Sequence, residues 1–278
     1  MGDHHNDIAN HYSIDDLKER VFNALTREYG ALDNLTVANL AGADSFHIRG
    51  RAATVELAER VGFQADWRVL DVGSGPGGTA RHLASTYGCH VTGLDLTPSF
   101  VALAEELSSI VGLYEATEFE CGDALAMPFG DNSFDCVWLE HVQMNIEAKD
   151  RLATELHRVI KPGGKLAVYE IFSAGSDPVQ YPTPWSDTGE TSYLVTAEEM
   201  KSELIGTGLQ VDEWRDVTQT SADWFRAMSA KAAGGAPPNL GIHLVIDAMA
   251  PQKIANMLNN LADGRLTIIQ AVLSNPAT

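Results

Sequence analysis

The stretch Val69-Leu-Asp-Val-Gly-Ser-Gly-Pro-Gly-Gly78 predicts the fold of this chain. The apolar residues that lead into it, at 67–72, are typical of a buried parallel strand that ends in a tight turn. From Thr79 onward, apolar residues recur at spacings of three and four, which indicates a helix. A second strand follows at 91–95 and ends in an acid. This order of strand, glycine loop, helix and acid-ended strand predicts a nucleotide-binding βαβ unit.

The residue types of this loop suit a ligand that the backbone approaches closely. Gly73, Gly75 and Gly77 carry no Cβ, so the chain can turn sharply beside a ligand. The carboxylate of Asp95 can accept hydrogen bonds from two ribose hydroxyls. The spacing G-x-G-x-G does not fit the dinucleotide fingerprint, and the chain has no phosphate-binding G-x-x-x-x-G-K-[ST] sequence. A plain structural turn is the alternative, which the acids Asp71 and Asp95 on either side of the loop disfavour.

Composition and charge exclude several classes of protein. The 278 residues are 45% hydrophobic, which supports a full core in one domain with elaborations or with a small lid. The formal net charge of −19 disfavours nucleic acid as a partner, because no basic stripe exists to neutralise phosphates. No apolar run approaches the roughly 20 residues that span a bilayer, and no signal peptide is visible, so we expect a cytoplasmic protein without membrane insertion. Cys89, Cys121 and Cys136 are scattered, which favours buried free thiols over a zinc site.

Strand and helix patterns continue to alternate along the chain. The expected elements are strands at 119–123, 134–139, 165–172 and 209–218, and helices at 98–111, 149–159, 196–207, 222–233 and 243–261. Five successive βα alternations predict a parallel sheet with helices on both faces. The last apolar run, 265–273, is not preceded by a simple helical crossover. We therefore expect this strand to lie antiparallel, at or near the edge of the sheet.

Five segments, in this order, resemble the motif set of class I S-adenosylmethionine-dependent methyltransferases. They are Val69-Leu-Asp-Val-Gly-Ser-Gly-Pro-Gly, Gly93-Leu-Asp95, Gly122-Asp-Ala-Leu-Ala-Met-Pro-Phe129, Asn132-Ser-Phe-Asp-Cys-Val137 and Arg158-Val-Ile-Lys-Pro-Gly-Gly164. The resemblance implies an α/β, Rossmann-like, doubly wound fold: a seven-stranded, mostly parallel sheet with the last strand antiparallel. The domain organisation expected from it is an N-terminal helical lid (1–50), a cofactor-binding core (51–218), an inserted helical segment (219–264) and a final strand that completes the core sheet (265–278).

The resemblance also implies which residues bind S-adenosylmethionine. The methionine moiety is expected to lie near Asp71, Gly73, Ser74, Gly75 and Gly77. Asp95 is expected at the ribose hydroxyls, Leu96 beside the adenine, Asp123 at the adenine amino group with Ala124 next to it, and Glu140 at the mouth where sulfonium and acceptor meet. For each acid, a solvated strand end or a helix cap is the alternative. No metal is expected.

Within this superfamily the chain is similar to small-molecule enzymes such as sarcosine/dimethylglycine N-methyltransferases and quinone C-methyltransferases. Some of these carry a histidine two to four residues after the acid that ends the fourth strand, whereas this chain has Glu140-His-Val-Gln-Met-Asn-Ile146. We expect Glu140, His141, Gln143 and Asn145 to face the acceptor. His141 is a candidate base, with a core histidine as the alternative. Gln143 and Asn145 suit a polar acceptor, which favours an amine or a group that is already acidic.

The expected acceptor is a small amine or amino acid such as sarcosine or dimethylglycine. Its carboxylate would pair with Arg49 and Arg51, unless these are ordinary surface arginines. Tyr29, Tyr181 and Trp185 are expected to cover the site. A second hypothesis is C- or O-methylation of an aromatic, quinone, sugar or polyketide-like molecule, and a third is a non-catalytic S-adenosylmethionine-binding protein. A homodimer is left open.

Overall fold

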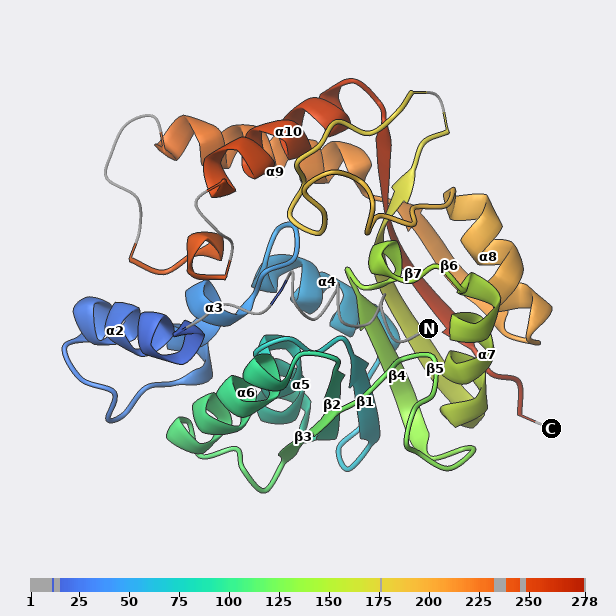
Figure 1. Cartoon of the computed structure of the whole chain (residues 1–278). Coiled ribbons are helices and arrows are strands. Elements are labelled where there is room, and N and C mark those ends of the chain that lie inside the picture. Colours follow the sequence, from blue (N-terminus) through green and yellow to red (C-terminus); the bar gives the residue numbers. More distant parts are fainter. Residues whose placement is uncertain (1–11, 13–15, 176, 233–238, 246–248, 278) are drawn as a thin grey trace.

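The computed structural model describes residues 12, 16–175, 177–232, 239–245 and 249–277 of the chain (Figure 1). Its strands are β1 (Arg68–Val72), β2 (His90–Asp95), β3 (Thr117–Cys121), β4 (Phe134–Glu140), β5 (Ile160–Ser173), β6 (Gln210–Asp216) and β7 (Leu266–Ser274). All seven form one sheet in the order β3-β2-β1-β4-β5-β7-β6. The chain therefore builds outward from β1 in one direction and then, from β4, in the other. This is the doubly wound arrangement that the sequence predicts.

The last strand runs against its neighbours. β1 to β5 pair in parallel with one another, whereas β7 pairs antiparallel with both β5 and β6. The predicted seven-stranded sheet with an antiparallel last strand is thus confirmed. β7 does not form the edge itself, because β6 lies outside it.

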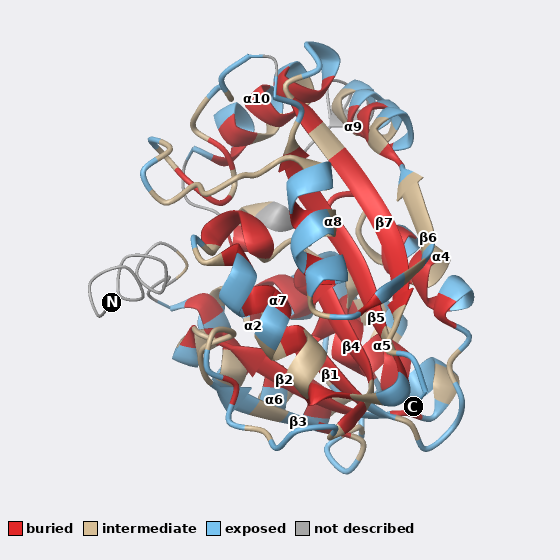
Figure 2. Ribbon diagram, turned by 90° about the vertical axis from the view of Figure 1, so that its right-hand side faces the viewer, coloured by how far each residue is buried: buried red, intermediate tan, exposed pale blue. Residues whose placement is uncertain are grey.

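Helices cover both faces of the sheet. In chain order they are α2 (Leu17–Tyr29), α3 (Val37–Asp44), α4 (Arg51–Val61), α5 (Gly78–Tyr87), α6 (Pro98–Ile110), η1 (Gln143–Asn145), α7 (Lys149–Val159), α8 (Ala197–Gly206), α9 (Thr218–Ala232), η2 (Ile242–Leu244) and α10 (Ala250–Ala262). One apolar cluster joins residues of α4, α5, α9 and α10 to the sheet, and a second joins α7 and α8. Strand residues alternate between the two clusters, as Trp138 and Leu139 of β4 do, so the clusters lie on opposite faces. The inner strands β1, β2, β4, β5 and β7 are accordingly buried along much of their length (Figure 2).

The N-terminal helices α2 and α3 share a third apolar cluster with α6, which packs on β2 and β3. Leu25 of α2, Leu40 of α3 and Leu103 of α6 belong to one buried apolar cluster, together with Leu244 of η2. Segments from the two ends of the chain therefore pack together beside the core, as Figure 1 shows for α2, α3 and the segment that carries η2. The part of the predicted lid that is described, 16–50, is helical in α2 and α3.

Several predicted boundaries differ from the structure. β3 ends at Cys121, so Asp123 lies in the turn that follows, where its Oδ1 accepts a hydrogen bond from the Leu125 N–H at 2.8 Å. Cys121 is exposed on this edge strand, so the expectation of three buried thiols is wrong for it. The helix predicted at 243–261 is divided into η2 and α10, because Pro251 at the first turn of α10 favours a helix start there.

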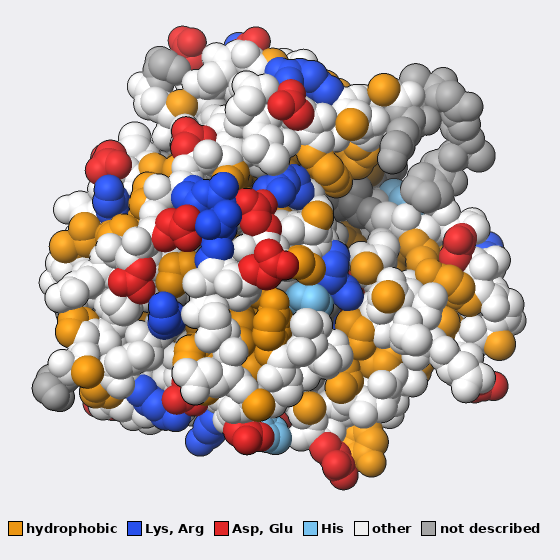
Figure 3. All heavy atoms as spheres, turned by 180° about the vertical axis from the view of Figure 1, so that it is seen from behind, with side chains coloured by type: hydrophobic (Ala, Val, Ile, Leu, Met, Phe, Trp, Pro, Cys, Tyr) orange, Lys and Arg blue, Asp and Glu red, His pale blue; other side chains and the backbone are white. Residues whose placement is uncertain are grey.

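The outer surface mixes both signs of charge. Seen from behind, Lys and Arg side chains lie next to Asp and Glu side chains (Figure 3). Ion pairs such as Arg60–Glu213 at 2.7 Å and Arg215–Glu56 at 2.8 Å are of this kind. Within the described residues, no helix has the length and apolar character that crossing a membrane requires. The same residues contain no cluster of three or more His, Cys, Asp or Glu side chains suited to a metal ion.

Candidate active site

A cavity of about 620 Å³ lies where the carboxyl ends of β1, β2 and β4 meet residues of α9 and α10. This is the position that the topology favours, because the chain reverses direction between β1 and β4 and leaves a crevice there. The acids at the ends of these three strands, Asp71, Asp95 and Glu140, all line it. So do Gly73, Ser74, Gly75, Leu96, Asp123, Ala124, His141, Asn145 and Trp185 among the residues expected at the site.

The glycine loop after β1 has the geometry that only glycine adopts easily. Gly73 and Gly75 have φ of 70° and 51°. A Cβ on Gly73 would lie 2.3 Å from Cγ2 of Val142, so a side chain there would collide with the segment after β4. The loop backbone can consequently approach a ligand in the cavity.

Gly77, by contrast, does not line the cavity. It is the N-cap residue of α5 with φ of 80°, and a Cβ there would lie 2.7 Å from the ring of Phe119 and 2.8 Å from Nη1 of Arg81. The close packing of α5 against β3 explains why a residue without a Cβ is needed at position 77.

Asp71 and Asp95 differ in how their carboxylates are satisfied. Asp71 is 2% exposed and its Oδ2 has no hydrogen-bond partner among the described residues. Burial raises the pKa of Asp71 well above its usual value, and the nearby Glu140 and Asp95 carboxylates raise it further. Asp95 accepts hydrogen bonds at 2.8 Å from the N–H groups of Gly75 and Thr97. A cationic ligand group beside Asp71 would compensate its unpaired, buried oxygen.

Glu140 at the end of β4 connects four parts of the structure. Its Oε2 accepts hydrogen bonds from Thr79 Oγ1 at 2.7 Å and from Trp138 Nε1 at 3.1 Å. Its Oε1 lies 3.3 Å from Nε2 of His47, in the loop between α3 and α4, and accepts a bond from Thr54 Oγ1 at 3.4 Å. The carboxylate therefore joins the N-terminal region to the core.

His141 lines the cavity but both of its ring nitrogens are engaged. Its Nδ1 lies 2.9 Å from the carbonyl oxygen of Tyr169, which can only accept, so Nδ1 carries the hydrogen. Its Nε2 then accepts a hydrogen bond from the Ile48 N–H at 3.3 Å. Burial, followed by the nearby His47, lowers the pKa of His141 to about 3. No lone pair of this neutral ring is left to take a proton from an acceptor.

The two amides after His141 are oriented differently. Gln143 is fully buried and does not line the cavity; its Nε2 donates to the carbonyl oxygen of Ile171. Asn145 does line the cavity, and its Oδ1 accepts a hydrogen bond from Tyr12 Oη at 3.0 Å. Its Nδ2 donates to the carbonyl oxygens of Trp185 at 3.0 Å and Thr191 at 3.2 Å. Asn145 thus holds two covering segments together.

The arginines expected to bind a substrate carboxylate are paired elsewhere. Arg49 forms an ion pair with Glu56 at 2.6 Å, and Arg51 lies 3.4 Å from Asp44. Neither lines the cavity, and none of the cavity-lining residues in the described part of the chain is a Lys or an Arg.

The expected aromatic cover is only partly at the site. Trp185 is buried and lines the cavity, with its Nε1 donating to Ser192 Oγ at 2.9 Å. Tyr29 is 40% exposed and donates to the carbonyl oxygen of Asn39. Tyr181 packs against Gly189, away from the residues that line the cavity.

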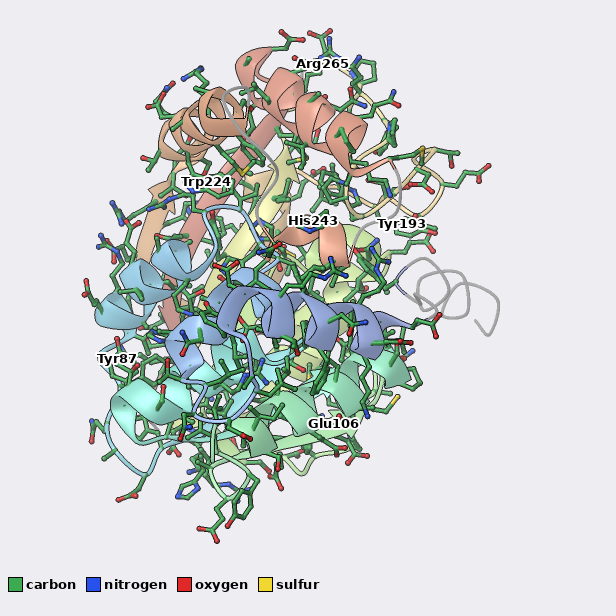
Figure 4. The ribbon with its side chains drawn as sticks, turned by 90° about the vertical axis from the view of Figure 1, so that its left-hand side faces the viewer. Tyr87, Glu106, Tyr193, Trp224, His243 and Arg265 are labelled. Atoms are coloured by element: carbon green, nitrogen blue, oxygen red, sulfur yellow. The ribbon has the colours of Figure 1, made fainter. Side chains whose placement is uncertain are left out.

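The far wall of the cavity is apolar and comes from segments that the sequence motifs do not mark. Its residues are Phe46, Ile171, Pro184, Tyr193, Trp224, Phe225, Met228, Ile254 and Met257. Figure 4 shows Trp224 of α9 and Tyr193 of the loop after β5 between the α9–α10 layer and the rest of the molecule. Neither these wall residues nor His47 are among the site residues predicted from the sequence.

Comparison with known proteins agrees with this geometry. A family model described as a methyltransferase domain matches residues 70–168, which contain the glycine loop and all three strand-end acids. Residues 70–168 thus form a methyltransferase domain. The resemblance found in the sequence motifs is thereby confirmed.

Relatives of this methyltransferase domain differ in what they methylate. The chain is 36% identical over 143 residues to a sterol 24-C-methyltransferase of Gibberella zeae, covering 51% of this chain and 38% of that protein. It is 32% identical over 163 residues to the glycine/sarcosine/dimethylglycine N-methyltransferase of Actinopolyspora halophila, covering 59% and 29%. The chain thus spans less than two fifths of the length of these two relatives.

A solved structure supports the fold over nearly the whole chain. Geranyl diphosphate C-methyltransferase of Streptomyces coelicolor A3(2) has a TM-score of 0.71 at 15% identity, covering 98% of both chains. At this identity the likeness establishes the architecture alone.

Proposed function

We propose that this protein transfers a methyl group from S-adenosylmethionine to a small, largely apolar molecule. The observation that carries the proposal is the composition of the cavity described above. One side presents the glycine loop and buried strand-end acids, and the other presents aromatic and Met side chains without any Lys or Arg among the described lining residues. A polar donor and an apolar acceptor could meet between these two sides.

The residues of the donor side support this assignment. Asp71 would bind the ammonium group with its unpaired Oδ2, and the backbone at Gly73 and Gly75 would lie beside the methionine chain. Asp95 would accept hydrogen bonds from the ribose hydroxyls, and Leu96, Asp123 and Ala124 would surround the adenine. When bound, the donor supplies an electrophilic methyl group on a sulfonium. The protein's part is to position the acceptor in line with it and to exclude water.

The acceptor side disfavours an amino-acid substrate. A free carboxylate taken into a cavity needs a cation, because an unpaired buried charge is strongly unfavourable. Arg49 and Arg51 are held by Glu56 and Asp44 and do not line the cavity. N-methylation of a small amine such as dimethylglycine is the second candidate, and the Actinopolyspora halophila relative supports it.

The remaining elements have supporting roles in this proposal. In the predicted lid at 1–50, the described residues 16–50 cover the core at 51–218. In the inserted segment at 219–264, α9 and α10 supply much of the apolar wall, and β7 then completes the sheet. Asn145 fastens the cover by bonding Tyr12, Trp185 and Thr191. A cytoplasmic location stays a prediction.

The test combines a binding measurement with a product measurement. Calorimetric titration with S-adenosylhomocysteine should show one site per chain, and mass spectrometry should then detect methylated products in a mixed acceptor panel. The panel contains glycine, sarcosine, dimethylglycine, phenols, hydroquinones and a hydroxylated macrolactone. Methylation confined to the phenols, hydroquinones or macrolactone is the expected result. Methylation of sarcosine or dimethylglycine would overturn the apolar assignment, and binding without turnover of any compound would favour a non-catalytic binding protein.

A further inference from the structure

His47 has a geometry that the mechanism above leaves unused. It lies in the loop between α3 and α4, lines the cavity, and has a side chain that is 9% exposed. Its Nε2 lies 2.9 Å from Thr54 Oγ1 and 3.3 Å from Glu140 Oε1. Imidazole nitrogen, hydroxyl and carboxylate thus form a compact cluster beside the end of β4.

The partners of this cluster determine where the proton of His47 resides. Glu140 receives donors at both oxygens, from Thr79 and Trp138 at Oε2 and from Thr54 at Oε1, so both oxygens act as acceptors. An ionised carboxylate only accepts, so the Nε2 that faces it carries the hydrogen. Nδ1 of His47 is then the basic nitrogen. It makes no hydrogen bond within the described part of the chain.

We propose that His47 is the general base of this site and that the methyl acceptor is a hydroxyl group. This inference rests on the proposed methyltransferase function. The acceptor O–H proton passes to Nδ1 of His47, and an oxygen lone pair forms the new O–CH₃ bond as the C–S bond to the donor breaks, leaving the neutral thioether. The positive charge gained by the imidazole is balanced by Glu140, which acts as a positioning residue.

The surroundings of His47 support this role over that of His141. The ionisable side chains around its ring are Glu140, His141 and Tyr169. The ring centroids of His141 and of Tyr169 each lie 6.1 Å from that of His47. Tyr169 Oη donates to the carbonyl oxygen of Ile48, and the Nε2 of His141 is already an acceptor. Glu140 is therefore the anion that contacts His47. A hydroxyl needs such a base, whereas an amine that is already neutral does not.

Nuclear magnetic resonance can test the dyad without any acceptor. The full chain is labelled with ¹³C and ¹⁵N at histidine and saturated with S-adenosylhomocysteine, and the His47 signals are assigned by their loss in His47→Gln. We expect the Nε2–H tautomer in the wild type, because Nε2 lies 3.3 Å from the Glu140 carboxylate oxygen Oε1. The Nδ1–H tautomer would overturn the assignment.

Acceptors of graded acidity test the chemistry. 4-Methylphenol needs a base to lose its proton, whereas the much more acidic 4-nitrophenol is already largely ionised at the mildly alkaline pH of the assay. His47→Gln should lower kcat on 4-methylphenol by roughly 10²–10⁴-fold and on 4-nitrophenol far less. The matched control is His90→Gln at the exposed start of β2, which should match the wild type on both.

The outcomes separate this inference from the function on which it rests. Equal losses on both phenols would show that His47 serves binding or structure instead of proton transfer. Methylation of no hydroxyl compound, neither these phenols nor the hydroquinones and macrolactone of the panel, with S-adenosylhomocysteine still bound, would refute the hydroxyl acceptor. Failure of the wild type to bind S-adenosylhomocysteine would refute the proposed function itself.

Discussion

Replacing Asp44 by Asn tests the buried ion pair that connects α3 to the core. Asp44 Oδ2 lies 2.8 Å from Nη2 of Arg81, and both side chains are 0% exposed. Removing one partner of a buried pair destabilises proteins by about 3–5 kcal/mol. Arg81 keeps three other acceptors, the carbonyl oxygens of Pro76 and Ala104 and the Ser108 hydroxyl, so the lower end of that range, about 3 kcal/mol, applies here.

Thermal unfolding followed by circular dichroism measures this effect. At about 2–4 °C per kcal/mol for a chain of this size, Asp44→Asn should lower Tm by about 6–12 °C. Asp131→Asn is the matched control, because Asp131 is 71% exposed and its 3.0 Å ion pair with Arg158 contributes less than about 1 kcal/mol. A Tm within about 2 °C of the wild type for Asp44→Asn would refute the importance assigned to this pair.

Three further variants test the donor side and the segment after β4. Asp95→Ala should weaken S-adenosylhomocysteine binding by on the order of 1–3 kcal/mol in calorimetry; unchanged affinity would contradict the ribose assignment. Gly73→Ala should lower both Tm and that affinity, because its φ is 70° and the new Cβ would collide with Val142; a wild-type Tm would show that the loop adapts. The folded state holds His141 neutral, with a pKa of about 3. Below about pH 6.5 the unfolded state therefore binds more protons than the folded state. The free energy of unfolding should consequently fall by about 1.4 kcal/mol per pH unit between about pH 6.5 and pH 3. His141→Asn, which tolerates the φ of 57°, should flatten this slope in urea unfolding at several pH values; the same slope in both proteins would place its origin elsewhere.

The fold was predictable because its signals are local. Buried parallel strands appear as continuous apolar runs, and the glycine loop, strand-end acids and helical spacing lie within single segments of sequence. Errors occurred where local signals conflict with context. β3 ends before Asp123, because the Asp123 carboxylate accepts a hydrogen bond from the Leu125 N–H and so stabilises a turn there. Pro251 lies in the first turn of α10, within a segment whose pattern predicts one continuous helix.

The acceptor side was much less predictable because it depends on long-range packing. The pattern after β4 suggested that Gln143 faces the cavity. Glu170 of β5 instead accepts hydrogen bonds from the N–H groups of Val142 and Gln143 and fixes the backbone there, and the Gln143 amide turns inward to Ile171. The contact of His47 with Glu140 likewise joins positions far apart in the sequence, and neither residue alone indicates the other.

The way β7 is held has an evolutionary consequence. Its antiparallel register with β5 runs without interruption from Lys165↔Ser274 to Ser173↔Leu266, and β6 pairs along its other side. The helices α9 and α10 lie in the chain between β6 and β7, so both ends of this segment are held by strands of the sheet. Mutations in α9 and α10 can therefore change the apolar wall of the cavity, while the half of the molecule that carries the glycine loop keeps its structure. During evolution, the preference for a methyl acceptor can therefore change while the binding site for the methyl donor is retained.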